Sequence, residues 1–505
     1  MQKRKVHGVF RDALMELKEQ LTSISESIGH LLPELILLAA LVIVLIVGLI
    51  LKNNKQVIFQ AISFIALLLA FFVTLQNWPN QPMALFGGMM RLDDFSSFFK
   101  LLFFTGGFLT IIISPKKEER ATAEYIILIL AIVLGACLLT MSMNFVMLLL
   151  SLELISLSSY VLAGFAFDRK SAEGSLKYFL FGTVATACMI YGISLIYGLS
   201  GTLDFSSNQF LETLMDNNSQ LLLIASFLII TALLFKISAV PFHLWAPDVY
   251  ESAPTAVVAF LSVVPKLAGF SILIKIVLAL NLFGQSMVPW GTVIAVISLL
   301  SILVGNLSAL VQTNPKRMLA YSSIAQSGFL LIGLATISME GIHFSMFYSV
   351  IFLLMNFLVF STLKQFENSI SIESINNFSG LGRNSFLSAF SLLIGLIALT
   401  GLPPTAGFTA KLLIFTSLWG SYQDTQSIIF IVLFIVGLAN TVIALFYYLK
   451  IPYLLFLKVP ATEAVPIKTS YSGNLLNLIL VVILIYLFLA PGVLMGWINQ
   501  ITFVL

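Results

Sequence analysis

The sequence predicts an all-α polytopic membrane protein with about 14 transmembrane helices. Of its 505 residues, 59% are hydrophobic and only 10% are charged, and the mean hydropathy is +1.03. A soluble domain carries about 25% charged residues. Apolar stretches of about 20 residues, the length that crosses a bilayer, recur along the whole chain, and no segment between them could form a separate soluble domain.

The candidate spans and the basic residues between them predict one orientation. Apolar runs place the spans at residues 31–51, 56–75, 94–114, 121–140, 145–166, 176–199, 220–249, 254–278, 290–311, 318–337, 341–363, 385–418, 426–449 and 473–497. If the first span runs from outside to inside, the inward connections hold Lys52, Lys55, Lys116, Lys117, Arg120, Arg169, Lys170, Lys316, Arg317, Lys364, Arg383, Lys450, Lys458 and Lys468. The outward connections hold only Arg91. This asymmetry is the positive-inside pattern, and it places both termini on the outer face.

The first 30 residues do not fit this orientation. They would lie outside, yet they carry the basic residues Lys3, Arg4, Lys5, Arg11 and Lys18. We expect either an amphipathic surface helix or an extension read from an upstream start codon, with Met15 as the alternative start. A cleaved signal peptide is not expected, because no short apolar core with a small-residue cleavage site precedes the first span.

Residues that hold cofactors are scarce in this sequence. Cys137 and Cys188 lie alone inside predicted helices, so no thiolate set is present for an iron–sulfur cluster or zinc. The four histidines show no metal-ligand spacing, and the "GLGRNS" run at 380–385 lies in a polar connection rather than after a strand. We therefore expect no redox or nucleotide chemistry in this chain. The energy for uphill transport must come from a partner or from another gradient.

Ionisable residues inside the spans are the candidate functional residues. Four lie near span ends and are expected to extend toward the membrane interface: Glu34, Lys100, Glu124 and Lys275. Five lie deeper: Glu153, Lys177, Lys236, Lys266 and Lys411. Any one of the five could form a structural ion pair. Because each costs at least a few kcal/mol in the membrane, five in one bundle favour a function.

The chemistry of the deeper residues favours protons as the transported ion. An arginine cannot release its proton in a protein, whereas a desolvated lysine can, and a nearby carboxylate opposes that release. Sodium requires oxygen ligands, and Glu153 is the only carboxylate expected deep in the bundle. Water-lined polar groups could still supply oxygens, so a sodium path stays open as the alternative.

Two spans are too long and contain backbone interruptions. Residues 220–249 would form a helix of about 45 Å, against a hydrocarbon core of about 30 Å, and Pro241 and Pro247 lie in its second half. The span at 385–418 contains "TGLPPTAGF". Matching interruptions in two halves indicate a transporter with inverted repeats and broken helices, in which Lys236 corresponds to Lys411. Two unrelated proline kinks are the alternative.

Long motifs carry a resemblance to a known family. They read "LELISLSSYVLAGF", "SAEGSLKYFLFG", "LIYGLSGTLDF", "FKISAVPFHLWAPDVYESAPT", "NPKRMLAYSSIAQSGFLLIG" and "GLPPTAGFTAKLLIF". These strings resemble the antiporter-like membrane subunits of bacterial respiratory complex I, the NADH–quinone oxidoreductases, and above all the subunit N (subunit 2) group. The resemblance is dense over 120–450, extends to the other helices by order and length, and does not include residues 1–30.

The resemblance implies fourteen helices with two inverted five-helix repeats and broken helices seven and twelve. The regions would be an extension at 1–30, helices one to three at 31–120, repeats at 121–280 and 281–450, and helix fourteen at 451–505. It also implies a multi-pass, proton-translocating subunit of a translocase in the bacterial inner membrane. The chain itself would hold no cofactor, whereas NADH, FMN, iron–sulfur clusters and quinone would bind elsewhere in the complex. The expected partners are the other complex I subunits and the bilayer, without nucleic acid.

The resemblance further implies a role for each buried charge. Glu153 is the fifth-helix carboxylate, and Lys177 is its sixth-helix partner. Lys236 is the central seventh-helix lysine, and Lys266 is the eighth-helix relay. Lys411 is the twelfth-helix residue that leads to the outer exit, and related subunits hold lysine or glutamate there.

His243, in "PFHLW", follows Lys236 by seven residues and lies on its inner side. Two roles stay open for it. Its imidazole could take part in proton uptake from the inner face, or it could stabilise the broken helix through a hydrogen bond.

Three other functions share part of this pattern. A subunit of a multisubunit Na⁺/H⁺ antiporter shares the fold and the Glu/Lys pattern, but the strings at 197–205 and 241–255 favour the complex I subunit. A quinone-binding redox subunit would need haem-ligating histidines or a polar quinone pocket, and neither is visible. A solitary solute carrier would need a spread of polar residues to form a substrate cavity.

Overall fold

The computed structural model describes residues 22, 24–51, 56–79, 81–114, 122–210, 212, 220–281, 289–370, 372–458 and 470–502. Most of the predicted extension at 1–30 therefore lies outside the described residues. The α-helices are α2 (Leu32–Ile50), α3 (Gln56–Gln76), α4 (Asp94–Ile113), α5 (Thr122–Met141), α6 (Phe145–Ala163), α7 (Arg169–Ser200), α9 (Gln220–Lys236), α10 (Trp245–Ser252), α11 (Thr255–Asn281), α12 (Trp290–Leu310), α13 (Pro315–Ala335), α14 (Met339–Glu367), α15 (Phe386–Thr400), α16 (Ala406–Thr425), α17 (Ile428–Phe456), α18 (Tyr471–Leu489) and α19 (Pro491–Ile498). Shorter elements are the antiparallel strands β1 (Met83–Leu85) and β2 (Met90–Leu92) and the 3-10 helices η1 (Ile375–Phe378) and η2 (Leu381–Arg383).

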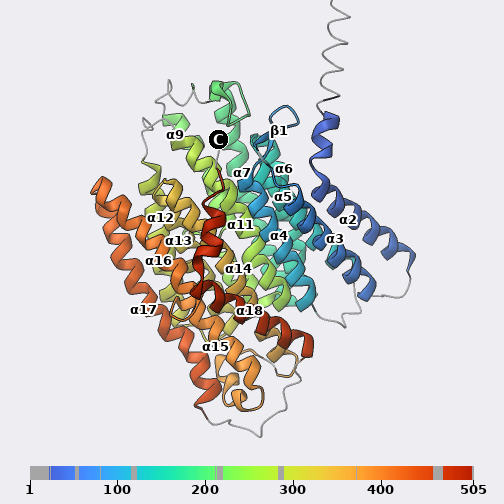
Figure 1. Cartoon of the computed structure of the whole chain (residues 1–505), viewed down its shortest axis with the longest axis vertical. Coiled ribbons are helices and arrows are strands. Elements are labelled where there is room, and N and C mark those ends of the chain that lie inside the picture. The colour runs from blue at the N-terminus through green and yellow to red at the C-terminus, as the bar shows by residue number, and fades with distance from the viewer. Residues whose placement is uncertain are drawn as a thin grey trace, which may run out of the picture.

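The structure confirms the all-α polytopic fold class. Its long helices lie side by side in one bundle (Figure 1). Among the described residues, 12 helices are long and apolar enough to cross a membrane, by length and composition. Two shorter apolar helices, α9 and α15, are the first halves of the spans expected to be interrupted. The count of fourteen spans and the inverted-repeat relation stay predictions.

Both predicted interruptions are present. In the first, α9 ends at Lys236 and α10 begins at Trp245; in the second, α15 ends at Thr400 and α16 begins at Ala406. Proline accounts for each break, because it lacks a backbone N–H and excludes the residue before it from helical conformation. At the second break Gly401 has a φ of 86°, in the left-handed region that favours glycine. Each break leaves backbone carbonyl groups that accept from side chains of other helices or of the other half-helix, such as those of Ile237 and Thr400.

Two predicted spans have different bounds in the structure. The last one, 473–497, is two helices, because Pro491 ends α18 and begins α19. The sixth begins at Arg169 rather than 176, so α7 is about 48 Å long and extends past the membrane core. Its start is fixed by a capping box, in which the Asp168 side chain accepts a hydrogen bond from the Ser171 backbone N–H at 2.7 Å.

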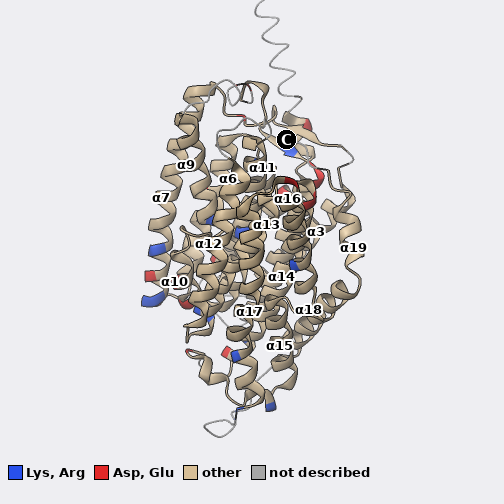
Figure 2. Cartoon of the chain, turned by 90° about the vertical axis from the view of Figure 1, so that its left-hand side faces the viewer, with Lys and Arg blue, Asp and Glu red and all other residues tan. Residues whose placement is uncertain are grey.

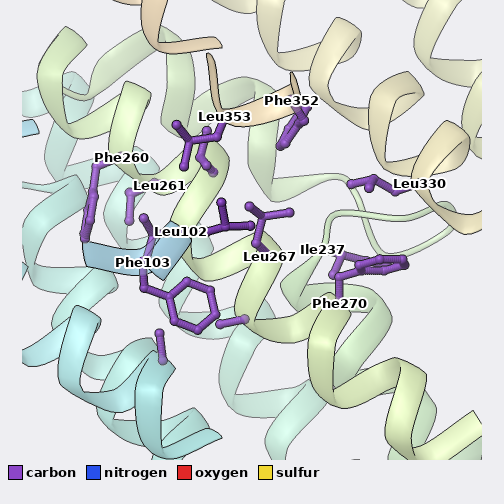
Figure 3. Packing of buried hydrophobic residues seen from close by; sticks show 14 of the residues in the cluster. Leu102, Phe103, Ile237, Phe260, Leu261, Leu267, Phe270, Leu330, Phe352 and Leu353 are labelled. Carbon is purple, nitrogen blue, oxygen red and sulfur yellow. The ribbon is translucent and has the colours of Figure 1, made fainter. Parts of the chain in front are cut away.

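Helices α11, α13 and α14 form the interior of the bundle. Within the 18-residue apolar stretch that could cross the membrane, every residue of α11 is buried, and 94% of the residues are buried in α13 and in α14. In α2, α3, α17 and α18 the buried share of this stretch is only 28–33%. Figure 3 shows Leu267 and Phe270 of α11 surrounded by Leu102 of α4, Leu330 of α13 and Phe352 of α14. The peripheral helices leave large apolar side chains exposed, which suits contact with lipid. In Figure 2 charged residues lie near α10, beside α16 close to the C-terminus and at the lower end of the bundle near α15, and few lie along its middle.

Candidate functional site

Lys236 is buried at the C-terminal end of α9, with 1% of its surface exposed. Its Nζ donates a hydrogen bond to Ser156 Oγ at 3.2 Å and lies 5.9 Å from the centre of the Tyr178 ring. No carboxylate forms an ion pair with it among the described residues. The ammonium group is therefore held by a hydroxyl and an aromatic face rather than by a counter-ion.

Glu153 lies in the middle of α6, three residues before Ser156, so the two side chains share one face of the helix. Its carboxylate forms neither a hydrogen bond nor an ion pair with Lys236 in the described part of the chain. The carboxylate is half-buried and accepts a hydrogen bond from Thr186 Oγ1 of α7 at 2.6 Å. This arrangement lets Glu153 influence Lys236 by electrostatics.

Lys177 does not lie deep in the bundle and does not pair with Glu153, so both expectations are wrong. Its side chain is 42% exposed, and its Nζ lies 2.9 Å from carboxylate oxygens of Glu173 and Asp248. The early start of α7 explains the difference, because it puts Lys177 only two turns from the inner end of that helix. Asp248 also accepts a hydrogen bond from Arg317 Nη1 at 2.7 Å, so this network links α7, α10 and α13.

His243 lies in the break between α9 and α10 and is largely buried, with 9% exposed. Its Nδ1 has no hydrogen-bond partner within the described part of the chain. A buried polar atom without a partner is costly unless water or a transient partner reaches it. The placement fits a role beside Lys236, and which of its two predicted roles it has stays open.

Lys266, on α11, is bound by hydroxyl groups of α13. Its Nζ donates to Ser323 Oγ at 2.8 Å and lies 3.4 Å from Ser327 Oγ, and the side chain is 1% exposed. Ser327 in turn donates to the backbone carbonyl of Ile237 at 2.7 Å. Because Ile237 directly follows Lys236, one serine bridges Lys266 to the break that carries Lys236.

Lys411, on α16, reaches back to the other half of its broken helix. Its Nζ donates to the backbone carbonyls of Thr400 at 2.7 Å and Leu399 at 3.2 Å, at the end of α15. The side chain packs against Gly401, where an added Cβ would lie 2.6 Å from Lys411 Cδ. Glycine at this position thus provides both the left-handed turn and the space for the lysine.

Gln326, on α13, joins the second break to the centre of the bundle. Its Nε2 donates at 2.9 Å to the Leu399 carbonyl, which also accepts from Lys411. Its Oε1 accepts a hydrogen bond from the Tyr348 hydroxyl of α14.

We call Lys236, Lys266 and Lys411 the central lysine row. Sequence reasoning had assigned no role to the residues of α13 that link them.

A signal for these linking residues was present in the sequence. The string "YSSIAQSG" at 321–328 sets polar side chains at Ser323, Gln326 and Ser327 inside an apolar span. Spacings of three and four residues place them on one face of a helix. In the folded chain this face of α13 lies toward the central lysine row. The sequence alone does not show that orientation.

Three of the four charges expected at the membrane interface are buried instead. Lys100 Nζ lies 2.8 Å from Glu34 Oε1, and these side chains are 1% and 4% exposed. Lys275, fully buried, donates to the Thr140 carbonyl at 2.7 Å and lies 3.9 Å from Asp93 Oδ2. We call Glu34, Asp93, Lys100 and Lys275 the outer ion-pair cluster. The fourth charge, Glu124, is exposed as expected.

The outer ion-pair cluster also corrects the count of deep carboxylates. Glu34 and Asp93 are buried, whereas Glu153 is only half-buried. Each buried carboxylate faces a lysine, so neither offers an uncompensated charge to a sodium ion. Among the described residues, no group of three His, Cys, Asp or Glu side chains could hold a metal ion.

The central lysine row consists of titratable groups whose partners are neutral. Its ammonium groups contact hydroxyl and carbonyl oxygens, which accept a hydrogen bond but do not fix the positive charge as a carboxylate would. Ser323, Ser327 and Gln326 lie between successive lysines, so a rearrangement of side chains and water could connect them.

Comparison with known proteins bears on this arrangement. Residues 142–438 match the family described as NADH:quinone oxidoreductase/Mrp antiporter, TM, and residues 17–115 match NAD(P)H-quinone oxidoreductase subunit 2 N-terminal. The second match begins within the predicted extension at 1–30. The chain is 36% identical to NADH-quinone oxidoreductase subunit N 2 of Chloroherpeton thalassium, over 94% of each chain.

Solved structures agree with this match. The chain is similar to one chain of respiratory complex I from Thermus thermophilus, with 29% identity, a TM-score of 0.78 and coverage of 92% of this chain and 99% of that one. It also shares its fold with a chain of the Mrp complex from Dietzia, with a TM-score of 0.79, 19% identity and coverage of 93% and 96%.

Proposed function

Because the chain belongs to the family of NADH:quinone oxidoreductase and Mrp antiporter membrane subunits, we propose that its central lysine row carries protons across the membrane. The chain is a proton-translocating membrane subunit of the NADH–quinone oxidoreductase type, and thus part of a translocase. Electron transfer from NADH through FMN and iron–sulfur clusters to quinone takes place in other subunits, which are its partners. Its membrane is the bacterial inner membrane.

The observation that carries this proposal is the row of three buried lysines, none of which has a carboxylate counter-ion among the described residues. Lys236, Lys266 and Lys411 are at most 5% exposed, and their partners in that part of the chain are neutral oxygens and aromatic rings. Burial opposes the charge of an ammonium group, and no carboxylate in the described part of the chain holds these charges in place. Like-charge repulsion along the row then favours release from one lysine when its neighbour gains a proton.

The two helix breaks give this row its proposed ends. In the predicted orientation, the first break opens toward the inner face through His243, and a proton taken up there reaches Lys236. Ser327 and Ser323 connect Lys236 to Lys266, and Gln326 leads on to Lys411. Lys411 lies beyond the second break, on its outward side, and releases the proton outward. The negative charge of Glu153, on α6, sets the proton affinity of Lys236.

The experiment that tests this function also separates it from a Na⁺/H⁺ antiporter subunit. Vesicles containing the assembled complex are supplied with NADH, and proton uptake is recorded while sodium is replaced by potassium at constant ionic strength. We expect unchanged pumping, because both buried carboxylates of the outer ion-pair cluster face lysines. A steep sodium requirement with sodium accumulation in the vesicles would support the antiporter instead.

A further inference from the structure

A cavity of about 290 Å³ lies between the C-terminal ends of α4 and α14 and the N-terminal end of α18. In the predicted orientation all three ends lie at the inner face of the membrane. The proton path described above does not use this cavity. Its lining includes the apolar residues Ile112, Ile113 and Leu476 and the polar residues Lys364, Gln365 and Ser361.

One buried hydrogen-bond donor among the residues that line this cavity has no acceptor in the described part of the chain. Gln365 is 5% exposed, and its Oε1 accepts from Ser388 Oγ at 2.8 Å, whereas its Nε2 has no partner in the described part of the chain. The Nε2 points at the first turn of α18, because a Cβ added to Gly473 would lie 2.4 Å from it. A buried amide donor left without an acceptor is costly, so a ligand is expected to supply one.

The N-terminal end of α18 adds further donors of the same kind. The first backbone N–H groups of a helix have no partner within the helix, and they carry partial positive charge. The N-cap residue, Ser470, does not satisfy them; its hydroxyl bonds to the Ser472 hydroxyl at 2.8 Å instead. No acidic residue lies in this first turn. Such a helix end is suited to an anion.

The charge of the cavity also favours an anion. Lys364, in the last turn of α14, lines it, and no carboxylate does so among the described residues. The nearby Glu367 is engaged elsewhere, since its Oε1 lies 3.7 Å from Lys316 Nζ and accepts a hydrogen bond from Thr255. A single cation, an amide N–H and helix N–H groups form a donor set for a phosphate group.

We propose that this cavity binds the phosphate of an anionic phospholipid from the inner leaflet. The phosphate accepts from Gln365 Nε2 and the first turn of α18, beside the Lys364 ammonium, and Ile112, Ile113 and Leu476 receive the apolar part of the lipid. A free phosphate ion could accept the same hydrogen bonds, but it would leave the apolar lining residues uncovered. Gly473 keeps the space open, because any larger residue would push Gln365 into the site. Basic pockets between membrane helices on the inner side are a known setting for acidic headgroups.

The test uses the whole complex in phosphatidylcholine vesicles that contain a photoreactive phosphatidylglycerol. After illumination, mass spectrometry measures labelling of peptides that contain residues 361–368 and 470–476. We expect labelling in the unaltered complex and a loss of about tenfold in Lys364→Gln, the effect of removing one charge-assisted hydrogen bond. Gly473→Ala should lower labelling similarly. The matched controls Lys450→Gln and Gly420→Ala, an exposed lysine and a glycine whose Cβ would meet open space, should leave it unchanged.

Competition separates the two sources of phosphate. Unlabelled phosphatidylglycerol should abolish labelling, whereas excess inorganic phosphate should not. Loss of labelling with inorganic phosphate, equal labelling in all variants, or no labelling of these peptides would each overturn the proposal. The readout is lipid binding rather than pumping, so it stands or fails independently of the proposed proton transfer.

Discussion

The central lysine row and the outer ion-pair cluster bury the same residue type in two different ways. In the outer cluster, Lys100 lies 2.8 Å from Glu34, and Lys275 lies 3.9 Å from Asp93. In the row, Lys236, Lys266 and Lys411 have only neutral oxygen and ring partners among the described residues. Burial alone therefore does not distinguish the two groups of lysine, whereas the presence of a carboxylate does.

This difference separates structure from function. A buried ion pair fixes both charges, and breaking it leaves the remaining charge uncompensated at a cost of about 3–5 kcal/mol. A buried lysine without a counter-ion can exist in either protonation state, which proton transfer requires. We infer that the outer cluster holds α2, α4 and α11 together and that the row is the moving part of the mechanism.

The largest expected effect is on assembly, through the outer cluster. Lys100→Ala leaves the Glu34 carboxylate buried and alone, so we expect most of the subunit to be missing from the assembled complex on native gels. Adding Glu34→Gln removes the orphan charge and should restore much of the assembly. Full assembly of the single variant with lost pumping would instead place this pair in the proton path.

A smaller effect is expected at the second helix break, where assembly should persist. Lys411→Ala removes the donor to the Thr400 and Leu399 carbonyls and should lower proton pumping about tenfold. Lys411→Glu should retain part of the pumping, because a protonated carboxyl can still donate to one carbonyl and can titrate. If both variants pump equally poorly in assembled complex, titration at this position is not required and Lys411 has a structural role.

A still smaller effect is expected at Glu153, which acts on Lys236 at a distance. Glu153→Gln removes the charge while keeping a group that can accept from Thr186, so we expect pumping to fall about three- to fivefold. Glu153→Asp should be milder because it keeps the charge. Equal pumping by the Gln and Asp variants, measured in the same vesicles, would show that the charge has no role.

The sequence allowed prediction of the fold class and of the residues in the row, for simple physical reasons. Apolar runs of membrane length define the helices, prolines define the breaks, and lysines inside such runs must be buried. The pairing of charges could not be predicted, since it depends on contacts between distant segments. Glu34 and Lys100 were expected at the membrane interface. However, Trp497 of α19 packs against this end of α4, with its ring centre 5.5 Å from that of Phe98.

The error at Lys177 has a similar cause. The string "RKSAEG" is polar, so the sequence did not indicate that it forms the first turns of α7. The predicted span therefore began just before Lys177, and we expected this lysine to pair with Glu153. Of its two carboxylate partners, Glu173 lies one turn away on the same helix, whereas Asp248 lies 71 residues away and reaches Lys177 because α10 folds back after the first break. Short-range patterns thus predict helices well but do not predict which side chains meet.

The most direct test of the account is the rate of NADH-driven proton pumping, in membrane vesicles, by assembled complex that carries Lys236→Arg. Arginine keeps the positive charge and most of the volume but cannot release its proton. If the row transfers protons, pumping should fall about tenfold or more, as it should in Lys236→Ala, while the amount of assembled complex stays unchanged. Normal pumping by the arginine variant would contradict the account, because a fixed charge at position 236 would then serve as well as one that titrates.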